Sequence, residues 1–190
     1  MNSSDTKKSI MKIARNLILS RGYNAFSYQD VADEIGIKKA SIHYHFSSKA
    51  ALGAAVIRRD RKRFQNWCKD LITRTDDIWQ KLENYFQIFE YIRTQGNRIC
   101  TACILTAEYV TLPKSMQKEL KQLIDNELDW LTNILTEGRK SNMFSYIGEP
   151  NKKALQIQAC LYGIMGVSRT HERMDWFYMV IDQLKTELRP

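Results

Sequence analysis

The stretch that decides the fold is residues 26–49, "FSYQDVADEIGIKKASIHYHFSSK". A short helix is predicted to open at Ser27, which forms a capping box with the acidic residue three positions on. Gly36 breaks that helix, because glycine adopts the left-handed conformation that ends a helix. A second short helix follows. Two short helices joined by a glycine turn are the layout of a helix-turn-helix.

The second short helix places its apolar and polar residues on different faces. At about 100° per residue, Ile42 and Phe46 lie about 40° apart and define the buried side. The outward side and its edges carry small and hydrogen-bonding residues: Lys38, Lys39, Ala40, Ser41, His43, Tyr44 and His45. This composition suits the major groove of DNA, where polar side chains reach base edges and cations at the rim reach phosphates.

The helices on either side fit the same arrangement. A first helix is predicted over about Asp5–Arg21, with one apolar stripe, and Gly22 ends it. A fourth helix is predicted to be capped by Ser47 or Ser48, which places Lys49 in its first turn. The helix dipole disfavours a cation there unless a phosphate sits beside it. Lys49 is therefore either a phosphate contact or a tolerated lysine.

The net charge is concentrated at the N-terminal end. Residues 1–63 carry 13 Lys and Arg against 5 Asp and Glu, whereas residues 64–190 carry 16 of each, so the whole net charge of +8 lies in the first third. A basic head on a neutral body indicates a polyanionic partner for the head. A basic face that is merely solvated is the alternative.

Residues 26–52 resemble the N-terminal signature of TetR-family transcriptional repressors, in which Tyr-x-Phe is followed by Ser/Asn-Lys-x-x-Leu. Here those positions are Tyr44, Phe46, Ser48, Lys49 and Leu52. The resemblance covers roughly residues 5–60, and it departs from the family at Ala40, Ala50 and Gly53. It implies a DNA-binding domain over residues 1–50 and a ligand-binding and dimerisation domain over residues 51–190. It also implies these DNA contacts: Ser27, Tyr28, Lys38, Lys39, Ser41, His43, Tyr44, His45 and Lys49.

The rest of the chain is predicted to be helical, which gives an all-α protein with a three-helix head and a body of about six helices. The long helix over residues 114–140 is predicted to end near Gly138. Abundant aromatic residues in the body helices predict an apolar effector pocket, although each of them is also compatible with an ordinary core. The candidates are Trp67, Trp79, Tyr85, Phe86, Phe89, Cys100, Cys103, Ile104, Tyr109, Trp130, Tyr162 and Met165.

Cys100 and Cys103 form the pattern Cys-x-x-Cys, which occurs in redox pairs and zinc sites. A zinc site is not expected, because the sequence has no second such pair and its only late histidine is His171. An enzyme that uses the two thiols would lack a paired base, so no catalytic residues are expected. A thiol sensor near a helix start stays open, as do two small apolar residues beside the pocket.

Composition excludes several other classes. No apolar run approaches the ~18–20 residues of a membrane span, and no secretory signal is present, so we expect a cytoplasmic protein without metal or cofactor.

The resemblance implies a homodimer that binds double-stranded DNA at a pseudo-palindromic operator, with recognition helices about 34–36 Å apart. A small apolar or aromatic effector is expected to release this repressor. The alternatives are a thiol-sensing regulator and an architectural DNA-binding protein without effector.

Overall fold

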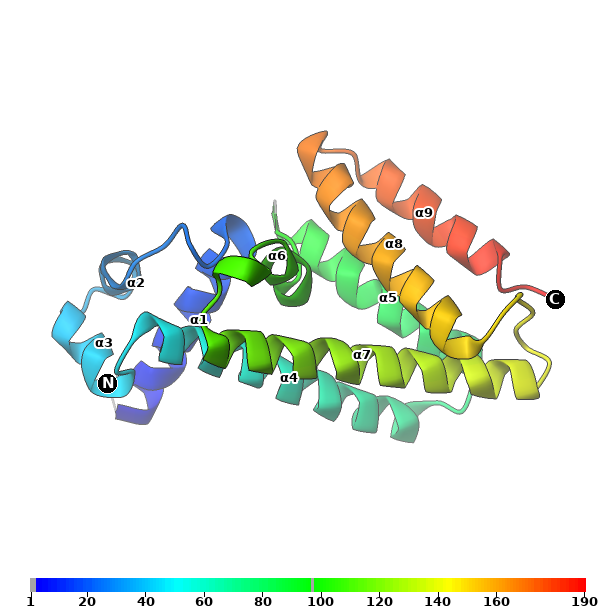
Figure 1. Cartoon of the computed structure of the whole chain (residues 1–190), viewed down its shortest axis with the longest axis horizontal. Helices are drawn as coiled ribbons and strands as arrows, with labels where there is room; N and C mark the ends of the chain where they lie inside the picture. Colours follow the sequence, from blue (N-terminus) through cyan, green and yellow to red (C-terminus); the bar gives the residue numbers. More distant parts are fainter. Residues whose placement is uncertain (1–2, 97) are drawn as a thin grey trace. The chain divides into compact units, whose positions relative to one another are not determined.

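A computed structural model describes residues 3–96 and 98–190, and it confirms the all-α prediction (Figure 1). Within those residues the chain forms nine α-helices and one short 3-10 helix. They are α1 Ser3–Arg21, α2 Tyr28–Ile35, α3 Lys39–His45, α4 Lys49–Arg74, α5 Ile78–Thr94, α6 Thr101–Ala107, η1 Tyr109–Thr111, α7 Lys114–Lys140, α8 Pro150–Thr170 and α9 Met174–Thr186.

The helices belong to two compact units that are not continuous in sequence. Unit 1 runs to Arg63 and also contains Thr101–Leu123, and unit 2 contains Phe64–Cys100 and Ile124–Pro190. The long helices α4 and α7 therefore each contribute residues to both units. The predicted division into residues 1–50 and 51–190 concerns function and stays a prediction.

The first three helices of unit 1 form the expected head. Ser27 caps α2 through a complete capping box with Asp30, and Gly36 follows in the left-handed conformation at φ 76°. Ile42 and Phe46 are buried, as the wheel predicts. In α1 the predicted apolar stripe is buried except Ile13, which is half-buried. Helix α1 packs against α2 and α3, and α2 against α3.

The segment Thr101–Leu123 is fastened to this head by polar side chains. Asp60 of α4 accepts hydrogen bonds from Arg15 Nε at 2.7 and 2.8 Å and from Thr101 Oγ1 at 2.5 Å. The Glu108 carboxylate accepts a hydrogen bond of 2.7 Å from the backbone N–H of Tyr23, directly after the end of α1. These contacts join α1, α4 and α6 within unit 1.

Two glycines are placed by close packing. Gly53 of α4 lies so near Met116 of α7 that an added Cβ would be 2.5 Å from the Met116 sulfur. Helix α7 ends at Lys140, near Gly138 as predicted, and Gly138 itself is buried within the helix. A Cβ at Gly138 would lie 2.1 Å from the ring of Phe144, which folds back on this helix. Both glycines therefore permit a close approach.

Candidate DNA-binding surface and candidate effector site

The outward face of α3 is available for contact. Tyr44 is 81% exposed, far more than a tyrosine in a packed position. Lys38, Lys39 and His43 are also exposed, whereas Ser41 and His45 are half-buried. The His43 ring packs edge-on against Tyr28 at 4.8 Å, and the His45 ring packs against Tyr44 at 5.1 Å. The neighbouring rings orient the polar groups of this face.

Ser27 and Tyr28 use their hydroxyl groups inside the head. Ser27 Oγ donates to Asp30 at 2.6 Å and accepts from the Asp30 backbone N–H. The hydrogen bonds that the Asp30 carboxylate accepts from the Ser27 hydroxyl and the Ser27 backbone N–H lower the pKa of that carboxyl. Tyr28 is buried and its hydroxyl donates to the Phe46 carbonyl oxygen at 3.0 Å. Burial raises the Tyr28 pKa to about 12. Both hydroxyl groups thus have partners within the head, and phosphate contact by Ser27 and Tyr28 stays a prediction.

Lys49 is the first residue of α4, and Ser48 caps that helix by accepting from the Ala51 N–H at 3.1 Å. The Lys49 ammonium lies 4.3 Å from the centre of the Tyr23 ring and 4.6 Å from that of Phe26. Partial burial lowers the pKa of Lys49, although the charges of Glu108 and Asp30 oppose this shift. The two rings stabilise a cation at a helix start even without a phosphate.

Replacing Lys49 with methionine separates these two roles. Lys49→Met keeps an apolar stem but removes the charge, so we expect about 0.5–2 kcal/mol of lost stability from the cation–π contacts. If Lys49 also contacts phosphate, the slope of log affinity against log salt falls by about 1. Fluorescence anisotropy over a salt series measures that slope, with exposed Lys62→Met on the same helix as the control. An unchanged slope would assign Lys49 to the rings alone.

The basic first half of α4 is largely tied to acidic side chains of unit 1. Arg58 and Arg61 both pair with Glu119, at 2.6 and 3.3 Å. Arg63 lies 3.5 Å from Asp60. Arg58 and Arg61 therefore help to hold α7 against α4, whereas Arg63 pairs within α4 itself.

Unit 2 gathers part of the predicted effector pocket into one aromatic cluster. The members whose rings contact one another are Phe64, Trp67, Tyr85, Phe86, Phe89, Trp130 and Tyr162. Tyr85 lies at the centre, with its ring 5.1 Å from that of Trp130 and 5.2 Å from that of Phe89. The sequence analysis missed Phe64, although its place three residues before Trp67 on α4 could have indicated it.

Other predicted pocket residues are placed elsewhere. Trp79 packs edge-on against Phe144 at 4.7 Å, and Met165 is fully buried within α8. Cys103, Ile104 and Tyr109 belong to unit 1, whereas Cys100 belongs to unit 2. The predicted pocket set therefore does not form one group in a single unit, and its role in binding stays a prediction.

The thiols give little support to the redox alternative. Cys100 is buried immediately before α6, and Cys103 is half-buried within it. Burial raises the pKa of Cys68 to about 12, which keeps that thiol protonated and unreactive. No disulfide and no cluster of three metal-binding side chains occurs within residues 3–96 and 98–190. Thiol sensing by Cys100 and Cys103 stays a prediction.

Comparison with known proteins decides the family. Residues 10–56 match the family described as "Bacterial regulatory proteins, tetR family". A transcriptional regulator of this family from Agrobacterium tumefaciens superposes over 100% of both chains, with a TM-score of 0.95 and 26% identity. The chain belongs to the TetR family of transcriptional regulators. A TetR-family regulator from Legionella pneumophila also matches over 100% of both chains, with a TM-score of 0.89 and 29% identity.

The relatives of this TetR-family regulator act on transcription. The repressor NemR of Escherichia coli is 21% identical over 90% of this chain and 89% of its own length. Together with the head geometry, family membership establishes a DNA-binding regulator of helix-turn-helix type. No helix in the described part of the TetR-family chain has the length and apolar character needed to cross a bilayer.

Proposed function

We propose that this TetR-family chain is a homodimeric repressor that reads a pseudo-palindromic operator through α3 and leaves it when a small effector binds in unit 2. The observation that carries the proposal is the 81% exposure of Tyr44 on a helix flanked by exposed lysines. A tyrosine exposed to this extent leaves its apolar ring surface in water, whereas contact with a base edge or a thymine methyl group would bury that surface.

Selection of bound sites from a random DNA pool at physiological salt tests this proposal. We expect an enriched inverted repeat whose half-sites are about one helical turn apart. Tight, salt-sensitive binding without any enriched sequence would overturn the proposal in favour of an architectural DNA-binding protein. The selected operator then allows compounds to be screened for release.

Tyr44→Ala is expected to lower operator affinity by about 10–100-fold, because one base contact contributes about 1–3 kcal/mol of discrimination. Affinity for random DNA should change little, since that binding depends on phosphates. Anisotropy titrations on both DNAs measure the two effects. Tyr91→Ala is the matched control, because Tyr91 is a 65% exposed tyrosine on α5 of unit 2. Equal losses on both DNAs would contradict base readout by Tyr44.

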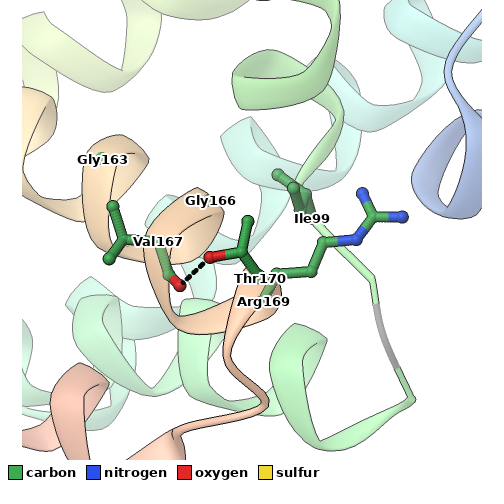
Figure 2. A pocket seen from close by; sticks show the side chains of 6 residues that line it. All are labelled: Ile99, Gly163, Gly166, Val167, Arg169 and Thr170. Carbon is green, nitrogen blue, oxygen red and sulfur yellow. Dashed lines mark hydrogen bonds between the residues drawn. The ribbon is translucent and has the colours of Figure 1, made fainter.

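An open face of α8 supports the homodimer. One side of the helix carries residues at positions i, i+4, i+8, i+11 and i+12, which are Leu155, Ala159, Gly163, Gly166 and Val167. Leu155 is 58% and Val167 50% exposed. Gly163, Gly166 and Val167 line a hollow together with Ile99, Arg169 and Thr170 (Figure 2). Its volume is about 670 Å³. An added Cβ would meet nothing within 4 Å at either glycine. A second copy could therefore approach closely here.

Gly163→Glu tests this face. The open space at Gly163 lets the single chain accept the side chain, but a pair of copies would bury two like charges. We expect sedimentation to shift from dimer to monomer while the circular dichroism spectrum stays helical. Gln87→Glu, which adds the same charge at an exposed position of α5, should leave the dimer intact. A dimer that survives Gly163→Glu would place the interface elsewhere.

A further inference from the structure

The aromatic cluster of unit 2 surrounds a carboxylate. Glu127 Oε2 accepts hydrogen bonds from Tyr162 Oη at 2.7 Å and from Gln158 Nε2 at 2.9 Å. Gln158 Nε2 also donates to Tyr162 Oη at 2.9 Å, so both side chains that contact this carboxylate of α7 come from α8 and also contact each other. The sequence analysis missed both Glu127 and Gln158.

The charge of Glu127 is felt by the phenols of the cluster. Burial is the main cause that raises the pKa of both Tyr85 and Tyr162 far above the ordinary value, and the nearby Glu127 charge raises both further. Both phenols therefore remain protonated, and their neighbourhood is electrically negative. A negative group and the negative faces of several rings favour the same kind of ligand, which is a cation.

The hydroxyl group of Tyr85 is buried in the cluster without a hydrogen-bond partner among the described residues. The Tyr85 side chain is 1% exposed. A buried hydroxyl without a hydrogen-bond partner destabilises the folded chain, unless a bound molecule supplies the missing partner. A ligand that reaches the centre of the cluster could provide that partner.

The outer members of the cluster are accessible. Trp67, Trp130, Tyr162 and Glu127 are half-buried, in contrast to the enclosed Tyr85. Trp67 and Trp130 come from α4 and α7, and their ring centres lie 5.2 Å apart. A molecule that contacts these two indoles also lies close to the chain segment that carries Glu127, three residues before Trp130 on α7 and therefore on the same side of the helix.

We propose that unit 2 binds an organic cation, with its positive charge beside Glu127 and its apolar part against Trp67 and Trp130. That such a cation is the effector rests on the proposed function, whereas the binding itself does not. A neutral aromatic ligand would use the rings but gain nothing from the carboxylate. An anion would be repelled by both.

Binding to the purified full-length chain without DNA tests the site. The probes are benzyltrimethylammonium, its neutral isostere neopentylbenzene, and benzoate. Calorimetry and tryptophan fluorescence should show that the cation binds at least about tenfold more tightly than the isostere, which corresponds to 1.4 kcal/mol. Benzoate should not bind detectably. Equal affinity for the cation and the isostere would overturn the proposal, and this comparison requires no variant.

Two acid-to-amide variants on α7 then locate the charge. Glu127→Gln should lower affinity for benzyltrimethylammonium by about tenfold and leave neopentylbenzene binding unchanged. Asp129→Asn, at an exposed acidic position two residues away, should change neither. An equal effect of both variants, or none from Glu127→Gln, would contradict the assignment. Thermal melts check that both variants are folded.

The outcome is distinguishable from failure of the repressor proposal. A chain that selects an operator but shows no preference for the cation would overturn this inference and leave the repressor intact. A chain that binds the cation in the predicted way but selects no operator would support the site and overturn the repressor. If benzyltrimethylammonium releases the selected operator DNA, and the Glu127→Gln variant no longer shows this release, the cation is the effector of the repressor.

Discussion

Asp60→Ala is expected to lower the free energy of unfolding by about 3 kcal/mol, because removing one partner of a buried charge pair costs about 3–5 kcal/mol and Arg15 is only partly buried. The Asp60 side chain is 9% exposed and the Arg15 side chain 25%. The substitution also leaves the Thr101 hydroxyl without the acceptor that it has at 2.5 Å. Urea denaturation followed by circular dichroism measures the loss.

A control variant and a double-mutant cycle accompany the Asp60→Ala measurement. Glu34→Ala removes an exposed carboxylate of α2 in the same unit, and it should change stability by no more than about 0.5 kcal/mol. In the double variant Asp60→Ala with Arg15→Met, no partly buried guanidinium is left without its carboxylate, so part of the lost stability should return. Additive losses would show that the two side chains do not stabilise each other.

Gly138→Ala is expected to destabilise the chain by about 1–2 kcal/mol, even though alanine is the better helix former by about 1 kcal/mol. The reason is that the new methyl group would lie 2.1 Å from Cδ2 and 2.7 Å from Cγ of Phe144. Phe144 is 3% exposed and its ring packs against Trp79, so it has little room to move. Overpacking of this kind costs about 1–3 kcal/mol.

Thermal and urea unfolding of Gly138→Ala measure this effect. Asn133→Ala is the matched control, because Asn133 is exposed on the same helix and its replacement should be neutral or slightly stabilising. If the Gly138→Ala chain is at least as stable as the original, the Phe144 ring repacks around the new methyl group without loss of stability, and the prediction is wrong.

The local features of the head were predictable because their causes lie within a few residues. Ser27 and Asp30 are three positions apart, and Gly22 and Gly36 follow their helices directly. The buried pair Ile42 and Phe46 follows from helical periodicity alone. Sequence reasoning did not reveal features whose cause is distant or depends on shape: the packing of Phe144 on Gly138 was not foreseen, because Phe144 returns to the helix after a turn.

The candidate sites show the same limit. Composition identified the exposed face of α3, but not that Tyr28 and Lys49 interact with groups of the head itself. Tryptophan and tyrosine indicated an aromatic cluster, whereas its carboxylate was missed because Glu127 and Tyr162 are 35 positions apart. Hydrogen bonds across such separations depend on how helices pack, and no local pattern records them.

The discontinuous course of unit 1 limits how this regulator can be re-engineered. An N-terminal fragment that ends at Arg63 would lack Thr101, Glu108 and Met116, which contact Asp60, Tyr23 and Gly53 respectively. We therefore expect that such a fragment does not fold independently. A chimaera that transplants the DNA specificity of this chain onto another sensor must carry Thr101–Leu123 along with the head, and the exchange therefore requires three junctions in place of one.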